Sequence, residues 1–147
     1  MLNIYIIAGA KIKNDSPIFD LIKVYLHRIT LYNVHIKEVE VKNLSTYAIN
    51  EKIFNLIPKD SYRIMLDEKG VEYSTLQLKS CLENITKQNI AFLIGGSDGF
   101  LPEYKNQVES MISLSRLTFP HQIARMLLVE QLYRVQCLQQ NHPYHRE

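Results

Sequence analysis

The stretch Ile90-Ala91-Phe92-Leu93-Ile94-Gly95-Gly96 decides the fold class of this chain. Five consecutive apolar residues that end at two glycines are typical of a buried strand in an α/β protein. The turn continues as Gly95-Gly96-Ser97-Asp98-Gly99. Glycines there let the backbone approach a ligand closely, and ligands of open α/β sheets bind beyond the carboxyl ends of the strands. We therefore expect either a ligand loop or an ordinary sharp turn after this strand, and the pattern favours neither.

Outward from this stretch, strands and helices alternate along the whole chain. Apolar periodicity and turn residues predict strands over 2–9, 34–41, 62–66, 90–94 and 113–119, and helices over 17–29, 45–56, 74–85, 102–111 and 121–139. Ser16-Pro17 provides a helix cap, and Ser74 with Gln77 forms a capping box. The second strand slips in alternation after Ile36, which predicts a bulge, and 67–70 reads as a turn that ends the third strand. The alternation predicts an α/β fold, with a mostly parallel sheet flanked by helices, in one domain over 1–147.

Composition places the chain among ordinary globular proteins. It has 147 residues, of which 46% are hydrophobic and 22% charged, and it lacks the ~20 consecutive apolar residues of a membrane span. The first residues lack the basic region and the small-residue cleavage site that are typical of a signal peptide, so we expect none. Cys81 and Cys137 lie in apolar helical patterns, as buried thiols of a reducing compartment do. We expect a cytoplasmic protein with no membrane association.

Charge alone does not indicate a nucleic-acid partner, because the net charge is only +2. The cations are nevertheless concentrated toward the end of the chain. This region contains Arg116, Arg125, Arg134, Arg146, His121, His142 and His145. Net charge conceals such a local concentration.

Two segments near the C-terminus have more than one interpretation. Leu114 to His121 mixes apolar and hydroxyl residues before a proline; a strand and turn is the favoured interpretation, and a second ligand loop is the alternative. The helix over 121–139 is apolar around much of its circumference, more than a surface helix needs. Burial in the core of one chain and burial at a dimer interface explain this breadth equally well. Within the helix, Glu130 and Arg134 have the spacing of a helical ion pair.

The C-terminal tail, Asn141-His142-Pro143-Tyr144-His145-Arg146-Glu147, is polar, aromatic and cationic. Its His-x-x-His spacing lacks helical zinc geometry and no cysteine joins it, so we expect no metal site. Chain ends are usually solvated unless a partner orders them. Tyrosine and arginine stack on bases, and arginine also pairs with phosphate, so an RNA partner is one explanation. No dinucleotide-binding fingerprint and no phosphate-binding P-loop occurs in the sequence.

Four segments together resemble one known family. They are Ile94 to Gly99, Leu114 to His121, Glu130 to Arg134, and the tail from Asn141 to Glu147. The chain resembles, over its whole length, the bacterial 23S ribosomal RNA (pseudouridine-N3) methyltransferases, the large subunit methyltransferase H group of the SPOUT class.

The resemblance implies a SPOUT fold with a deep C-terminal trefoil knot, which topology rules alone would not predict. It also implies a homodimer that takes S-adenosylmethionine as cofactor and methylates 23S ribosomal RNA on the assembled ribosome. By matching positions, the cofactor contacts are Leu66, Gly95, Leu114, Ser115, Arg116, Leu117, Thr118 and Phe119. Tyr144, His145 and Arg146 face the RNA as the candidate catalytic residues.

Two departures from the family pattern concern basic contacts near the site. The family usually has Val-Gly-Lys at the end of the first strand, where this chain has Ala8-Gly9-Ala10-Lys11. It usually has Gly-Lys after the third strand, where this chain has Gly70-Val71. The chain is also slightly short, and we place the missing residues in 45–59.

The chemistry requires that N3 of the pseudouridine lose its proton. We expect His145 either to accept that proton or only to position the RNA, while Arg146 or Arg116 stabilises the anion and Tyr144 stacks on the base. Two other classes compete with this hypothesis. A non-enzymatic RNA- or ribosome-binding module would share the basic end, and a small-molecule hydrolase or nucleotide-binding protein would need a nucleophile–base pair, which the sequence does not show.

Overall fold

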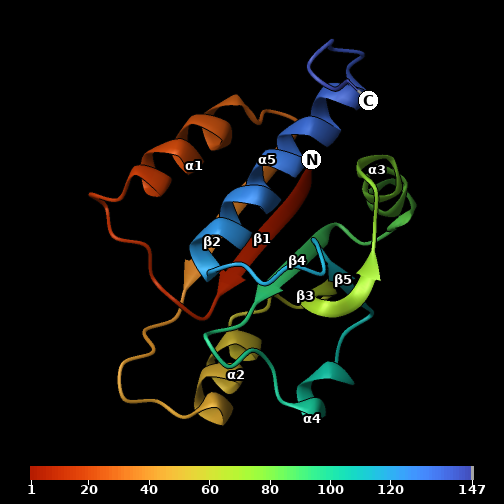
Figure 1. Ribbon diagram of the computed structural model, residues 1–147. Coiled ribbons are helices and arrows are strands. Elements are labelled where there is room, and N and C mark those ends of the chain that lie inside the picture. Colours follow the sequence, from red (N-terminus) through yellow and green to blue (C-terminus); the bar gives the residue numbers. More distant parts are fainter. Residues whose placement is uncertain (147) are drawn as a thin grey trace.

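The buried strand Ile90–Ile94 lies inside a parallel sheet, between two strands that precede it in the sequence (Figure 1). In this computed structural model, which describes residues 1–146, the strand order is β2-β1-β4-β3-β5. The strands are β1 (Leu2–Ala8), β2 (Tyr32–Glu38), β3 (Ser61–Glu72), β4 (Asn89–Ile94) and β5 (Ser110–Ser113). All four strand pairings are parallel, which confirms the predicted sheet.

Helices cover both faces of this sheet. They are α1 (Pro17–Arg28), α2 (Thr46–Asn55), α3 (Thr75–Asn84), α4 (Pro102–Lys105) and α5 (His121–Gln139). The predicted caps are present: Ser16 accepts a hydrogen bond from the backbone of Ile18, and Ser74 and Gln77 form the capping box. Side chains of α1, α3 and α5 pack on one face, and those of α2 and α4 on the other. The result is a three-layer α/β fold.

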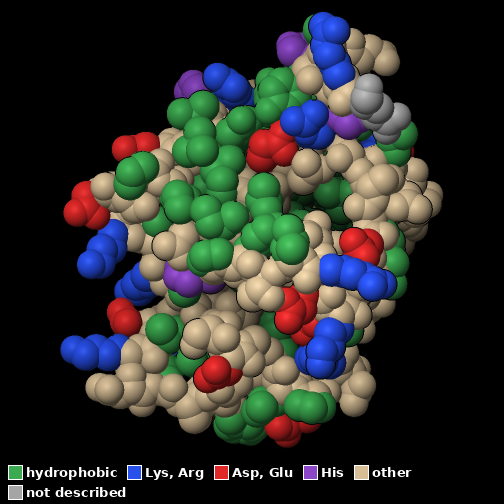
Figure 2. All heavy atoms as spheres, in the orientation of Figure 1, with side chains coloured by type: hydrophobic (Ala, Val, Ile, Leu, Met, Phe, Trp, Pro, Cys, Tyr) green, Lys and Arg blue, Asp and Glu red, His purple; other side chains and the backbone are tan. Residues whose placement is uncertain are grey.

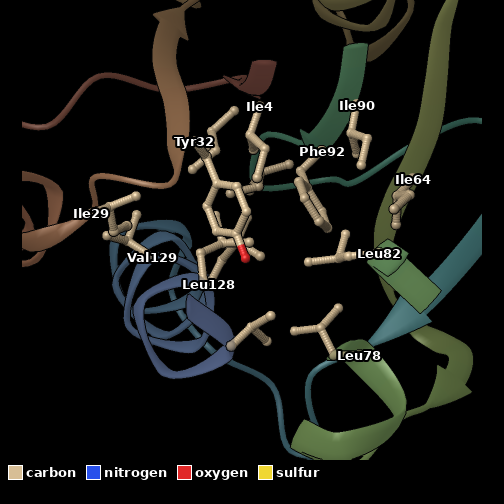
Figure 3. Close-up of a cluster of buried hydrophobic side chains, with 14 of the residues drawn as sticks. Ile4, Ile29, Tyr32, Ile64, Leu78, Leu82, Ile90, Phe92, Leu128 and Val129 are labelled. Atoms are coloured by element: carbon tan, nitrogen blue, oxygen red, sulfur yellow. The ribbon is translucent and has the colours of Figure 1, made fainter. Parts of the chain in front are cut away.

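The core follows from the two-residue period of the strands. Ile90 and Phe92 point toward α1, α3 and α5, whereas Ala91 and Leu93 point toward α2 and α4. Figure 3 shows Phe92 among side chains of neighbouring strands and helices, such as Ile64 of β3, Leu82 of α3 and Leu128 of α5. Each of these large side chains, when buried, stabilises the fold by about 1.5–3 kcal/mol. The sheet, and with it the ends of its strands, is therefore held rigidly.

Two of the predicted strand details are wrong. The second strand ends at Glu38, and its pairing with β1 runs from Tyr32 to Glu38 without the expected bulge. The third strand does not end at Leu66, because the chain returns to β5 at Val71. The segment 67–70 is the bulge instead: Asp67 accepts a hydrogen bond from the backbone of Lys69. A Cβ on Gly70 would lie 2.7 Å from the carbonyl carbon of Met111, so only glycine allows this approach.

The predicted helix over 102–111 and the predicted strand over 113–119 are also wrong. The helix stops at Lys105, because the backbone amide of Glu109 donates to the carbonyl of Arg63 and draws the chain to the sheet. β5 therefore begins at Ser110, and it ends at Ser113 because β3 offers no further partner beyond Glu72. Residues 114–119 form a loop, after which α5 has the predicted bounds.

Other expectations concern the cysteines, the membrane and the knot. Cys137 is buried, Cys81 is half-buried, and both are free thiols. No helix within residues 1–146 combines the length and the apolar character that crossing a membrane requires. The trefoil knot stays a prediction.

Candidate functional site

A cavity of about 740 Å³ lies at the carboxyl ends of β3, β4 and β5, beside the first turn of α5. Its volume is in the range of small-molecule sites, roughly 300–1,000 Å³. Three loop segments form its wall, namely 66–69 from the bulge of β3, 94–100 from the glycine turn, and 114–121 before and into α5. This is the edge of the sheet at which α/β proteins bind ligands.

The cavity brings together the residues that the sequence assigns to a cofactor, with one exception. Those that line it are Leu66, Gly95, Leu114, Ser115, Leu117, Thr118 and Phe119. The exception is Arg116, whose side chain is 88% exposed and whose Nε donates to Glu72 Oε1 at 2.8 Å. The interpretation of 114–121 as a strand was wrong, and the segment is a loop on the cavity wall.

The glycine turn after β4 has one defined conformation. Gly99 has a φ of 68°, which favours glycine, and its amide donates to the Gly96 carbonyl at 3.0 Å. A Cβ on Gly95 would lie 2.9 Å from the backbone of Gly99. Gly95 therefore has no room for a side chain on the side of Gly99.

Asn50 of α2 holds this turn by hydrogen bonds from the face of the sheet that α5 does not cover. The sequence did not lead us to predict this role for Asn50. Its side chain is completely buried. Its Nδ2 donates to the Gly99 carbonyl at 3.1 Å, and its Oδ1 accepts from the Leu101 amide at 2.9 Å. The sequence did contain a signal for this role, namely an amide side chain among the apolar positions of a helix. Buried polar groups are almost always hydrogen-bonded, so such an amide predicts specific partners.

Two side-chain hydrogen bonds join the 114–121 segment to β3 and its bulge. Thr118 Oγ1 donates to Glu68 Oε2 at 2.8 Å, and Arg116 Nε donates to Glu72 Oε1 at 2.8 Å. Within the loop, the Leu117 amide donates to Ser115 Oγ at 3.0 Å. The serine and threonine residues of 113–118 thus satisfy local polar groups, as they often do in turns.

The charged residues of the cavity wall are three carboxylates and two lysines. Asp67, Glu68 and Asp98 line it together with Lys69 and Lys105, and Lys105 pairs with Asp67 at 3.2 Å. Apolar surface from Leu66, Ile94 and Phe119 lies between them. Such a wall suits a ligand that has an apolar ring and a positive charge.

The N-terminal part of α5 is anchored beside the cavity by an ion pair whose arginine is buried. Arg125 is 3% exposed, and it donates to Glu38 Oε2 at 2.6 Å and to the Ala10 carbonyl at 3.1 Å. Lys11 is the last residue of Ala8-Gly9-Ala10-Lys11, the segment that departs from the family pattern. Its ammonium group pairs at the surface with Glu40. His121 lines the cavity, and burial, with the nearby Arg125, lowers the pKa of its imidazole, so the ring is neutral at pH 7.

The tail begins at the opposite end of α5 and returns to the middle of that helix. The helix has 19 residues, so at 1.5 Å per residue about 27 Å separates His121 from Gln139. The tail folds back onto α5 and α1, where the Tyr144 hydroxyl donates to Glu130 Oε1 at 3.1 Å. Arg134 Nη1 lies 3.2 Å from His145 Nδ1, and Arg146 is exposed. Glu130 is nine residues, roughly 14 Å, along α5 from His121, and none of Tyr144, His145 and Arg146 lines the cavity of their own chain.

Two further predictions concern this tail. Within residues 1–146, no cluster of three His, Cys, Asp or Glu side chains is placed to hold a metal ion. Glu147, the last residue of the predicted tail segment, lies outside the described residues.

Comparisons with known proteins agree with this geometry. The family model described as "Predicted SPOUT methyltransferase" matches residues 2–145. A protein of Prochlorococcus marinus (strain NATL2A) named "Ribosomal RNA large subunit methyltransferase H" is 40% identical over 150 residues, and the alignment covers 100% of both chains. A protein of the same name from Polynucleobacter asymbioticus is 44% identical over 117 residues, which cover 78% of this chain and 79% of that one.

Similarity in structure extends to a more distant protein, which shows the fold alone. A probable methylase family protein from Haemophilus influenzae Rd KW20 superposes with a TM-score of 0.62 at 10% sequence identity. The match covers 99% of this chain and 70% of that chain. With the full-length matches above, these findings confirm the resemblance inferred from the sequence: the chain belongs to the SPOUT methyltransferases and, among them, to the ribosomal RNA large subunit methyltransferase H family.

Proposed function

We propose that this methyltransferase transfers the methyl group of S-adenosylmethionine to N3 of a pseudouridine in 23S ribosomal RNA, on the assembled ribosome in the cytoplasm. The observation that carries the proposal is the cavity, which the Gly95 turn and the 114–119 loop enclose in a chain whose relatives are named for methylating large-subunit ribosomal RNA. A non-enzymatic RNA-binding module, the competing hypothesis, gives no reason for such a cavity in a chain of this family.

The residues of the cavity wall fit S-adenosylmethionine. Leu66, Ile94 and Phe119 offer apolar contacts to an adenine ring, and the turn at Gly95 offers backbone groups at close approach. The three carboxylates exceed the two lysines of the wall, of which Lys105 pairs with Asp67, and this small negative excess favours a cationic sulfonium over a neutral ligand. When bound, S-adenosylmethionine supplies a methyl group already activated by the positive sulfur. The chain's own residues then have to orient donor and acceptor and to manage one proton.

The separation of tail and cavity within one chain supports a homodimer with shared sites. Tyr144 is held at Glu130, roughly 14 Å along α5 from His121, and neither it nor His145 or Arg146 lines the cavity, so a second chain has to bring a tail to each cavity. Every residue of α5 is buried or half-buried, while Leu21 and Val24 of α1 are 46% and 43% exposed. Figure 2 shows hydrophobic side chains gathered over α1 and α5. We place the interface there, so that two antiparallel α5 helices bring each tail to the partner's cavity.

In this arrangement the tail supplies the RNA side of the site. Arg146 is exposed and suits the developing negative charge on the base carbonyls; Arg116, also exposed, is the alternative. The Arg134 guanidinium donates to His145 Nδ1, so the neutral imidazole of His145 carries its own proton on Nε2. This contact favours His145 as an RNA-positioning residue over His145 as the proton acceptor.

Methylation of purified ribosomes with labelled S-adenosylmethionine tests the function. We expect label in 23S RNA, as N3-methylpseudouridine by mass spectrometry, and none after deletion of 144–147, which should leave S-adenosylmethionine binding unchanged. Absence of label with the intact chain refutes the function, and loss of cofactor affinity on deletion moves the tail to the cofactor pocket.

Mixing two inactive variants tests the shared site. One chain lacks 144–147, and the other carries Gly95→Trp, which obstructs the cavity. If the tail acts on the partner's cavity, the mixed dimer regains one complete site and part of the activity. If neither mixing nor co-expression restores activity although mixed dimers form, the tail serves its own chain.

A further inference from the structure

Glu130, in the middle of α5, joins the tail to the body of the protein through a single carboxylate oxygen. Its Oε1 accepts hydrogen bonds from Arg134 Nη2 at 2.6 Å, from Arg134 Nε at 2.9 Å and from the Tyr144 hydroxyl at 3.1 Å. Its Oε2 accepts from Gln131 at 2.9 Å. The side chains of Glu130 and Arg134 are only 14% and 24% exposed, so these are largely desolvated, charge-assisted bonds.

The turn that leads into the tail is itself well defined. Asn141 has a φ of 57°, the left-handed conformation that asparagine tolerates after a helix. The His142 amide donates to the Cys137 carbonyl at 2.8 Å, and the Asn141 amide donates to the Leu138 carbonyl at 3.3 Å. These two bonds form a Schellman motif, which turns the chain back along α5.

Tyr144 is the residue that fastens the returning chain. Its ring packs edge-on against Tyr133 with centroids 4.8 Å apart, and the Arg134 guanidinium lies 4.7 Å from its centroid. Its hydroxyl lies 3.3 Å from that of Tyr25. Because Tyr144 has one proton and donates it to Glu130, Tyr25 donates to Tyr144, and α1 joins the chain of bonds. Burial is the main cause that raises the pKa of Tyr144, and its hydrogen-bond partners Tyr25 and Glu130 raise it further. The phenol therefore keeps its proton and remains a hydrogen-bond donor.

Glu130 also governs the second contact of the tail. Arg134 reaches His145 Nδ1 with Nη1 while Nε and Nη2 are held by Glu130. The fork geometry of a guanidinium means that fixing two of its nitrogens fixes the direction of the third. One carboxylate thus sets the position of Tyr144 directly and of His145 through Arg134.

From these contacts we propose that Glu130 is the positioning residue of the tail: it holds Tyr144 and His145 so that the exposed Arg146 is presented to RNA. Glu130 itself touches neither RNA nor cofactor. The inference deepens the proposed function and rests on it for the role of Arg146. In the held position, Tyr144 acts as an anchor, because its ring and its hydroxyl are both engaged by Tyr133, Arg134, Glu130 and Tyr25.

The test compares Glu130→Gln with Glu109→Gln in the full-length protein. Glu109 is a matched control, because it binds Arg63 with both oxygens at 3.0 and 3.2 Å, at the far end of the sheet from the cavity. For Glu130→Gln we expect faster amide hydrogen exchange in the peptide that ends the chain. We also expect kcat/KM for ribosomes to fall roughly 5- to 30-fold, the effect of losing one or two kcal/mol, with unchanged S-adenosylmethionine affinity. Glu109→Gln should change none of the three.

A second variant, Tyr144→Phe, distinguishes a specific Glu130–Tyr144 hydrogen bond from a general structural role of Glu130. It keeps the ring contacts and removes the bond to Glu130, so combining it with Glu130→Gln should cost less than the sum of the two single effects. Additive effects, unchanged exchange in Glu130→Gln, or a parallel loss of S-adenosylmethionine affinity would each overturn the proposal. If the wild-type chain methylates no RNA, the proposed function fails, and the exchange measurement still decides whether Glu130 holds the tail.

Discussion

Replacement of Asn50 by alanine should weaken both the fold and the cofactor cavity. The change removes the donor to the Gly99 carbonyl and the acceptor from the Leu101 amide, at a side chain with no exposure. Each buried backbone group left without a partner costs about 1–3 kcal/mol, so after partial relaxation we expect a loss of about 2–4 kcal/mol in the free energy of unfolding. For a chain of this length, Tm should fall by about 5–15 °C.

The turn that Asn50 braces contains Gly95, so the same variant should bind S-adenosylmethionine more weakly, by roughly 5- to 30-fold if one or two kcal/mol of loop order is lost. Thermal unfolding followed by circular dichroism gives the first quantity, and titration calorimetry gives the second. Asn55→Ala is the matched control, because Asn55 is an exposed residue of the same helix. The reasoning is refuted if both variants have the same Tm, or if Asn50→Ala lowers Tm and leaves the cofactor affinity untouched.

Three further outcomes follow from the site. Arg125→Met should lower the free energy of unfolding by about 3 kcal/mol in chemical denaturation, because it leaves the Glu38 carboxylate half-buried without its partner; Glu38→Gln in the same chain should recover part of the loss. His121, which faces Arg125 and Glu38, has a lowered pKa in the folded state. Between that folded pKa and the unfolded value of about 6.5, the unfolded state binds more protons than the folded state. The free energy of unfolding should therefore decrease as the pH falls from about 6.5 through the folded pKa of His121. The decrease should be smaller in His121→Gln, which has no imidazole to protonate. Arg116→Ala should leave Tm almost unchanged, because its exposed ion pair contributes less than about 1 kcal/mol; a shift above a few degrees contradicts this.

The elements that the sequence predicted well are those in which local pattern and tertiary packing agree. Ile90 to Ile94 is apolar at every position because both faces of β4 are covered, and Pro120 begins α5 where the loop ends. Ser16 and Ser74 act as caps through short-range hydrogen bonds, which sequence spacing captures. In these places no distant residue alters the outcome.

The errors occur where a distant strand overrides the local preference. Asp67 and Gly70 do form a turn, but β5 receives the chain again at Val71, so the turn is a bulge within β3. Residues 106–111 have a helical pattern, yet the bond from Glu109 to Arg63 commits them to the sheet. Pairing between segments more than forty residues apart is invisible to a periodicity count.

The candidate site was predictable only in part, and for a physical reason. The loop positions came from the resemblance, and their gathering around one cavity follows from parallel strands that end at one edge. Asn50 and Glu38 were missed because their contacts come from the far face of the sheet and from a neighbouring strand. The role of Glu130 was read as a helical ion pair, since nothing in the spacing indicates that Tyr144 returns to it.

The place of β4 between β1 and β3 has a consequence for how the chain folds while it is being synthesised. Residues 1–8 and 61–72 are synthesised before residue 89, so β1 lacks a partner on one edge and β3 on both edges while the chain grows. At 5–20 residues per second, the wait from Ala8 to Asn89 is roughly 4–16 s. Exposed strand edges are templates for aggregation, so the nascent chain is prone to aggregate during that interval. When β4 arrives, it joins β1 to β3 and brings Gly95 with it. The Gly95 turn is therefore in place before β5, the 114–119 loop and α5, which follow it in synthesis and complete the sheet, the cavity and the core.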